Sequence, residues 1–374
     1  MSQKYVSSSP TTDYTHDEFK DIVSFNKKSF KLEDQSPEWQ SKMFNLGRQF
    51  KAAGVGLVYF VPGTFAGDDP LGLVRLFEQK YPYFGKLCKV FNKEYIIDKI
   101  MVDCGNYTKE YVELFKKAIG TEIHCDLYLW TSENNHFGRL IGSIELVKKI
   151  ANDIDEKMPS WGKRVLLLGH SHAGQLFALM TNYLDQVPEV DELLTIANAG
   201  RIDISKFNEY LQKIRKVHLD YVTLGTPIRY KWANGWKDGK YKLLNIINHH
   251  GGGFLAGGDI YTKKFYWNFP RTTDGDYVQQ LALDGSDLDM SNELNKQLAG
   301  ILGKGEDIKE LLENVKARMR VPSYGRTILV DYKDNSTLWP NCLKTLFGHG
   351  VYTRYEKMLF NTQLIVDKMY GDAV

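Results

Sequence analysis

The ten residues from Val165 to Gly174, VLLLGHSHAG, constrain the fold more than any other stretch of the chain. An unbroken apolar run that ends at a glycine predicts a strand buried on both faces, which is typical of a parallel sheet. The residues that follow, QLFALMTNYL, carry apolar side chains at helical spacing. Ser171 therefore falls at a strand-to-helix corner. Gly169 and Gly174 leave the room that such a tight corner requires.

The letters around Ser171, GHSHAG, lie close to the pattern G-x-S-x-G. In that pattern a strained backbone holds a serine hydroxyl at the end of a sheet, where it acts as a nucleophile. Ala173 stands where a second glycine is usual. We predict that Ser171 is a catalytic nucleophile, and the alternative is a glycine-rich turn with an incidental serine.

A second buried strand is predicted from Val55 to Val61, and the sequence PGTFAG follows it. An acyl-transfer enzyme needs backbone N–H groups preset where negative charge develops on the attacked carbonyl oxygen. Thr64 is the preferred donor from this loop, with Phe65 as the alternative, and His172 is expected to supply the other donor. The alternative interpretation is that PGTFAG forms only a turn.

The end of the chain offers a base and an acid. A last strand is predicted from Thr327 to about Asp331, and a terminal helix is predicted to begin just after Gly350. His349 lies in a Gly-His-Gly loop between them, which favours an imidazole that reaches the serine and acts as its base. Asp334 is preferred as the acid that orients His349, because it follows the strand end, and Asp331 is the alternative.

Polar residues near two strand ends are candidates for the substrate pocket. A strand is predicted from about Glu122 to Trp130, and Glu133, His136 and Arg139 follow where it ends. Ligands bind beyond the carboxyl ends of parallel strands, so these residues are expected to line or buttress the site, with helix capping and solvation as alternatives. His170 is held on the tight corner itself and is expected at the pocket mouth. The candidate pocket residues are Phe65, Glu133, His136 and His170.

The segment from Arg229 to about Asp287 is long, aromatic and rich in glycine. We expect it to form a cap or lid insertion, spanning about residues 229–320 with a returning helix from about Glu306 to Arg318; an extra hairpin is the alternative. His249 and His250 could suggest a metal, but adjacent side chains point apart on a strand and no carboxylate stands at ligand spacing. No metal and no cofactor are predicted.

Four motifs together resemble α/β-hydrolases of the lipase and esterase type. They are the corner GHSHAG, the early loop PGTFAG, the sequence TLGTP after a strand predicted from Lys216 to Leu224, and the late GHGVY. The resemblance extends from about Gly54 to the carboxyl terminus. It implies an α/β fold with a mostly parallel central sheet, helices on both faces, a cap insertion, a catalytic triad, an oxyanion hole and no cofactor.

Carried over by position, the resemblance assigns the triad to Ser171, Asp334 and His349 and the oxyanion hole to Thr64 and His172. The chain departs from many lipases where Pro62 and Gly63 replace a His-Gly pair and where Ala173 replaces a glycine. The resemblance implies a serine esterase or lipase that acts on a small-molecule or lipid acyl ester. An acyltransferase, a thioesterase or an inactive hydrolase-fold binding protein are the alternatives.

The remaining expectations concern domains, partners and location. Residues 1–50 are expected to form an amino-terminal arm and strap, and residues 51–374 one hydrolase domain. A formal net charge of +2 gives no basis for a nucleic-acid partner, and no apolar run is long enough to span a membrane, although transient contact with a membrane surface stays open. Four cysteines without C-x-x-C spacing and no secretory signal favour a cytoplasmic location, with signal-independent export open. The sequence does not indicate an oligomeric state.

Overall fold

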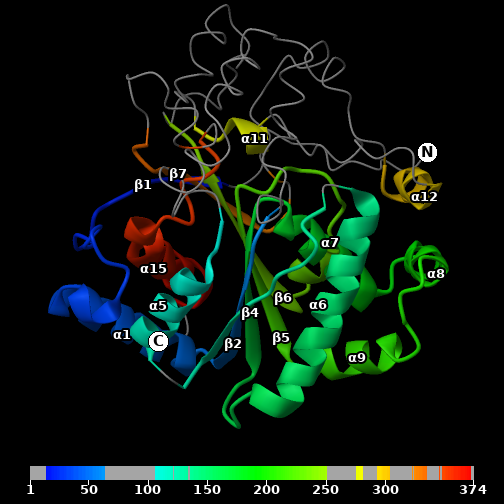
Figure 1. Cartoon of the computed structure of the whole chain (residues 1–374), viewed down its shortest axis with the longest axis horizontal. Coiled ribbons are helices and arrows are strands. Elements are labelled where there is room, and N and C mark those ends of the chain that lie inside the picture. Colours follow the sequence, from blue (N-terminus) through cyan, green and yellow to red (C-terminus); the bar gives the residue numbers. More distant parts are fainter. Residues whose placement is uncertain are drawn as a thin grey trace, which may run out of the picture.

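The computed structural model describes most of the body of the chain (Figure 1). The described residues are 14–63, 106–120, 122–133, 135–250, 275–280, 293–303, 322, 324–334, 345 and 348–371. The strands are β1 (Tyr14–Glu18), β2 (Val55–Val61), β3 (His124–Leu127), β4 (Arg164–His170), β5 (His218–Leu224), β6 (Tyr241–Asn248) and β7 (Arg326–Asp331). The α-helices are α1 (Pro37–Ala52), α5 (Lys109–Ile119), α6 (His136–Lys157), α7 (Ala173–Asp185), α8 (Val190–Ala199), α9 (Phe207–Ile214), α11 (Tyr277–Gln280), α12 (Glu293–Leu302) and α15 (Met358–Met369).

The seven strands form one sheet in the order β1-β7-β6-β5-β4-β2-β3. Every neighbouring pair is parallel. The chain moves outward from β2 to β3, then returns to β4 on the other side of β2 and continues in the opposite direction across the sheet. Such a reversal opens a crevice at the carboxyl ends of the two strands on either side of it, here β2 and β4.

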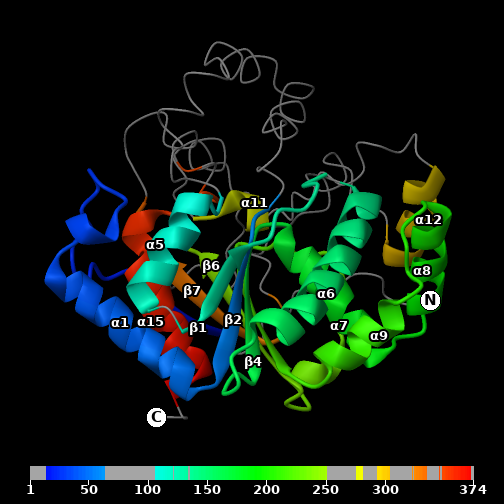
Figure 2. The ribbon, with the colours of Figure 1, turned by 60° about the horizontal axis from the view of Figure 1, so that its bottom comes forward.

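Helices cover both faces of the sheet (Figures 1 and 2). Helices α1, α5 and α15 pack on one face, and α6, α7, α8, α9 and α12 pack on the other. The central strands are buried along nearly their whole length, which agrees with their apolar sequences. The α/β class and the parallel sheet with helices on both faces are therefore confirmed.

Local sequence explains how α1 becomes part of this body. The Ser36 side chain accepts a hydrogen bond from Trp39 N at 3.2 Å, and Pro37 stands at the first helical position, where no N–H is needed. Trp39, Met43 and Phe50 lie on one face and are fully buried against the sheet. Burying each such side chain stabilises the fold by roughly 1.5–3 kcal/mol.

The expected amino-terminal strap of residues 1–50 is wrong for its described part. Strand β1 pairs with β7 along the edge of the sheet, and α1 contributes to the core. The sequence of β1, YTHDE, is polar because an edge strand keeps much of its surface in water, so no apolar pattern marked it. Residues 14–52 therefore belong to the α/β body.

The expected insertion at about residues 229–320 also contains a core element. Strand β6 lies between β5 and β7 and is almost wholly buried. Its run LLNII has the apolar character of a parallel strand, but the aromatic and glycine-rich surroundings favoured a cap. Residues 251–274, 281–292 and 304–321, with the helix predicted from Glu306 to Arg318, lie outside the described residues.

The carboxyl-terminal helix begins later than the sequence predicts. Residues 351–354 form turns, a short 3-10 helix spans Tyr355–Lys357, and α15 begins at Met358.

Among the helices that the structure describes, none is both long and apolar enough to cross a membrane.

Candidate active site

Ser171 occupies a strained corner at the carboxyl end of β4. Its φ is +55°, in the left-handed region that residues with a side chain rarely adopt. Two contacts over-determine this backbone: Ser171 N donates to Leu224 O at 2.9 Å, and Thr226 Oγ1 donates to Ser171 O at 2.7 Å. The Ser171 side chain is buried, and its Oγ makes no hydrogen bond to any residue that the structure describes.

Two glycines allow other segments to approach this corner. A Cβ atom on Gly63, just after β2, would lie 2.5 Å from Ser171 Cβ and 3.2 Å from its Oγ. A Cβ atom on Gly174 would clash with the Thr226 side chain, which holds the Ser171 carbonyl. The loop that leaves β2 thus begins in contact with the Ser171 side chain, at the crevice between β2 and β4.

His349 carries a carboxylate partner, and that partner is Asp276. The Nδ1 atom of His349 lies 2.8 Å from Asp276 Oδ2, and both side chains are fully buried. The Tyr352 hydroxyl donates to the same Oδ2 at 2.7 Å, while Gln279 N donates to Oδ1 at 2.9 Å. Three donors therefore fix the Asp276 carboxylate, and the hydrogen bonds on both of its oxygens offset the cost of burying it.

Asp334 and Asp331, the acids expected for His349, contact a different histidine. His250 Nδ1 lies 2.7 Å from Asp331 Oδ1, and His250 Nε2 lies 2.8 Å from Asp334 Oδ1. The expectation failed because two strands, β6 and β5, lie between β7, which precedes these acids, and β4, which precedes Ser171.

Asp276 lies on the other side of β6. Its N–H donates to Asn248 O at 2.9 Å, and a Cβ atom on Gly225, after β5, would lie 2.5 Å from its Oδ2. It stands close to the corner because β5 pairs directly with β4. Sequence reasoning missed this residue, and the signal that would have led to it was the unrecognised strand β6, which the acid follows.

The histidines beside Ser171 pack against His349. The rings of His170 and His349 have centroids 4.8 Å apart, and His170 Nε2 lies 3.0 Å from His349 O, to which it donates. Burial, and then the neighbouring His349, lower the pKa of His170 to about 3. Burial, followed by Arg139 and His349, holds the pKa of His172 well below its usual value. Both imidazoles are therefore neutral at physiological pH, and His170 supports the backbone of His349 from a fully buried position.

The expected oxyanion donors are only partly within the described chain. Thr64 and Phe65 lie outside the described residues. The loop that contains them starts at Gly63, whose N–H donates to Asn106 Oδ1 at 2.9 Å. His172 is the residue after Ser171 and occupies the N-cap position of α7. Peptide N–H groups at a helix amino terminus point outward and favour negative charge.

The remaining candidates for the pocket occupy different environments. Glu133 is exposed, and its Oε2 accepts from Asn135 Nδ2 at 3.2 Å, while the Asn135 side chain caps α6 through Gly138 N. His136 is fully buried, with Nδ1 2.7 Å from the Tyr230 hydroxyl and Nε2 3.1 Å from Arg229 Nη2. Burial, and then Arg229, lower its pKa to about 2, so His136 is a neutral part of a packed polar cluster.

One group within the described residues has the composition of a metal site: His124, Asp126 and Asp153. Lys149 Nζ lies 2.6 Å from Asp126 Oδ2 and 2.9 Å from Asp153 Oδ2, and Lys157 Nζ lies 2.8 Å from Asp153 Oδ1. An ion here would have to displace ammonium groups that already neutralise the carboxylates. His124 and Asp126 belong to β3 and Asp153 to α6, so this group lies away from Ser171.

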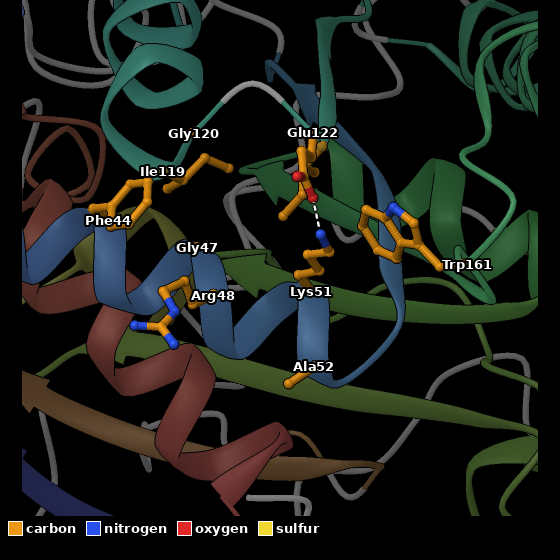
Figure 3. A pocket seen from close by; sticks show the side chains of 10 residues that line it. Phe44, Gly47, Arg48, Lys51, Ala52, Ile119, Gly120, Glu122 and Trp161 are labelled. Carbon is orange, nitrogen blue, oxygen red and sulfur yellow. Dashed lines mark hydrogen bonds and ion pairs between the residues drawn. The ribbon is translucent and has the colours of Figure 1, made fainter.

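A hollow of about 620 Å³ is also found at the opposite end of the sheet (Figure 3). Its walls include Phe44 from α1, Ile119 from the end of α5, and Trp161, while Lys51 and Glu122 form an ion pair across it. These segments lead into the amino ends of β2, β3 and β4. The hollow is therefore separate from the site at Ser171.

Comparisons of the chain with protein-family models, with curated proteins and with solved structures found no match.

Proposed function

We propose that this protein is a serine hydrolase that cleaves carboxylic esters through an acyl-enzyme, with Ser171 as nucleophile, His349 as base and Asp276 as the orienting acid. The observation that carries the proposal is a serine at φ +55° whose preceding residue, His170, packs against the histidine of a buried histidine–aspartate pair. Serine, aspartate and histidine follow three different strands in that chain order, which is the order of α/β-hydrolase triads. The parallel sheet with helices on both faces supports the same assignment.

The chemistry follows from these positions. Ser171 Oγ attacks the ester carbonyl carbon and passes its proton to His349 Nε2, because Nδ1 is directed to Asp276. Nε2 then returns the proton to the alcohol oxygen as the C–O bond breaks, which leaves the acyl group on Ser171. Water gives a proton to Nε2 and attacks the acyl carbon, and that proton returns to Oγ as the carboxylic acid leaves.

The oxyanion of each tetrahedral intermediate would lie between the His172 N–H and the loop that begins at Gly63. The contact of Gly63 with Ser171 supports this placement, since donors must stand within about 3 Å of the developing charge.

Labelling with a fluorophosphonate, together with hydrolysis of p-nitrophenyl esters of graded chain length, tests this function. We expect Ser171→Ala to abolish both labelling and turnover. Ser132→Ala is the matched control, because Ser132 is also buried with φ +55° but its hydroxyl donates to Trp130 O. Labelling that persists in Ser171→Ala, or turnover that is equal in the two variants, would refute the assignment.

A further inference from the structure

Asn248, the last residue of β6, is fully buried and makes hydrogen bonds to four residues of three other segments. Its side-chain Nδ2 donates to Gly348 O at 2.9 Å and reaches the Asp334 carboxylate at 3.3 and 3.4 Å. Its backbone N–H donates to the Tyr352 hydroxyl at 2.7 Å, and its carbonyl accepts from Asp276 N at 2.9 Å. One residue therefore contacts the segments that carry the acid and the base.

Three of these contacts hold the acid–base pair in place. Gly348 directly precedes His349, so the bond to its carbonyl sets the start of the histidine loop. The bond from Asp276 N holds the acid at the end of β6, and the Tyr352 hydroxyl donates its own hydrogen bond to Asp276 Oδ2. The chain of donors runs from Asn248 N–H through Tyr352 to the carboxylate that accepts from His349.

Gly348 shows how closely these segments pack. Its φ is +81°, and a Cβ atom at this position would clash with the carbonyl of Gly275, the residue before Asp276. The loops of the acid and the base therefore touch through backbone atoms, and they have little freedom to adjust if one of them moves.

The His250 side chain anchors the remaining partner of Asn248. Its two ring nitrogens contact Asp331 and Asp334, which binds the ends of β6 and β7 to each other. An imidazole that faces a carboxylate on each nitrogen is favoured in the cationic form, because only that form has two N–H groups. Asp334 is thus held in place as an acceptor for the Asn248 amide.

We propose that Asn248 is a positioning residue that sets the geometry of the Asp276–His349 pair from the end of β6. The inference rests on the proposed function, and it concerns a residue that does not touch the substrate. The variant Asn248→Asp keeps the size of the side chain but removes its N–H donors, so Gly348 O loses its hydrogen bond. It also brings a second carboxylate toward Asp334. Misplacement of a catalytic group by about 1 Å can lower turnover by about 10²-fold.

The main test compares Asn248→Ala with Asn245→Ala, a matched variant on the same strand. Asn245 is also buried, and its Nδ2 donates to a carbonyl, Tyr324 O, at 2.8 Å, while its Oδ1 accepts from Thr223 Oγ1. We expect Asn248→Ala to lower kcat on a p-nitrophenyl ester by about 10- to 100-fold with KM nearly unchanged. Asn245→Ala should keep kcat close to that of the wild type at a comparable loss of melting temperature. Equal losses of kcat, or no loss in Asn248→Ala, would overturn the proposal.

A second measurement does not depend on turnover. Proton NMR of the wild-type protein should show a downfield Nδ1–H resonance that Asp276→Asn removes, which assigns it to His349. We expect this resonance to shift or broaden in Asn248→Ala and Asn248→Asp and to persist in Asn245→Ala. Its persistence in both Asn248 variants would overturn the proposal. If the wild-type protein neither labels at Ser171 nor hydrolyses esters, the proposed function fails, and this resonance alone decides whether Asn248 positions the pair.

Discussion

Replacement of Asp276 by asparagine perturbs the proposed site with the smallest change in shape. The carboxylate accepts from His349 Nδ1 and the Tyr352 hydroxyl on Oδ2, and from Gln279 N on Oδ1. An asparagine has only one acceptor oxygen. If that oxygen faces His349, the amide NH2 group meets the Gln279 N–H, and a buried donor without an acceptor costs about 1–3 kcal/mol.

The opposite orientation avoids this cost and damages the base instead. The oxygen then accepts from Gln279 N, and the NH2 group donates to His349 Nδ1 and to the Tyr352 oxygen. His349 must carry its proton on Nε2, which is the wrong tautomer to take a proton from Ser171. The same change in a serine-protease triad lowers turnover by about 10⁴-fold, which corresponds to about 5.5 kcal/mol of transition-state stabilisation. We therefore expect Asp276→Asn to lower kcat by about 10³- to 10⁴-fold.

The assay is hydrolysis of a p-nitrophenyl ester, with the melting temperature measured for each variant. Asp153→Asn is the matched control, because Asp153 is a buried carboxylate that accepts from a tyrosine, Tyr59, at 2.7 Å but lies on α6 away from Ser171. Asp334→Asn should lower kcat by no more than about tenfold, since Asp334 reaches the Asp276–His349 pair through Asn248. A larger loss in Asp334→Asn than in Asp276→Asn would refute the assignment of the acid.

Two further predictions concern the corner and the buried histidines. Gly63→Ala should slow fluorophosphonate labelling of Ser171 and destabilise the fold by about 1–3 kcal/mol, because the new methyl group meets Ser171 Cβ, whereas Gly300→Ala, with open space around it, should do neither. Labelling at the wild-type rate in Gly63→Ala would show that the loop does not press on the serine. The folded-state pKa values of His170, about 3, and His136, about 2, lie below the unfolded value of about 6.5, so the stability that they contribute is present above that pH and falls as the pH decreases toward the folded values. As the pH falls from 6.5 to 5, each should lower the free energy of unfolding measured in urea by about 1.6 kcal/mol in total, because the unfolded histidine goes from half to fully protonated. His170→Asn should remove one such contribution, and an unchanged pH dependence would contradict the buried neutral state.

Strands that are buried on both faces could be read from the sequence. Val55–Val61 was predicted with the bounds that the structure gives, and the strands before Ser171 and Thr226 were placed within one or two residues. The reason is that a fully buried parallel strand leaves an unbroken apolar run, which few other elements produce. Strand β1 has no such run, because it lies at the edge and most of its described side chains are at least partly exposed.

Ser171 and His349 could be predicted from the residues next to them, whereas Asp276 could not. Ser171 and His349 each have glycines within three residues, and these glycines indicate the tight turns that both positions require. Asp276 lies 28 residues beyond Asn248, in a segment that no periodicity connects to β6. What brings it to His349 is the backbone bond to Asn248 and the close approach of Gly225, and both depend on the order of strands in the folded sheet.

The buried histidines at or beyond the ends of β4, β6 and β7 are distinguished by their partners more than by their burial. His170 and His172 have no carboxylate among the causes that set their pKa values, so burial keeps them neutral. Burial also lowers the pKa of His249, to about 4. His250 faces two carboxylates, which raise its pKa against the effect of burial, so it favours the charged form and serves as a fixed ionic link. His349 differs from all four, because it combines one carboxylate on Nδ1 with a ring packed against the residue before Ser171. A histidine that takes a proton from a serine needs an acceptor on Nδ1, so that Nε2 is left to receive the proton. Asp276 orients His349 in this way, which is why we assign the base to His349 and the fixed ionic link to His250.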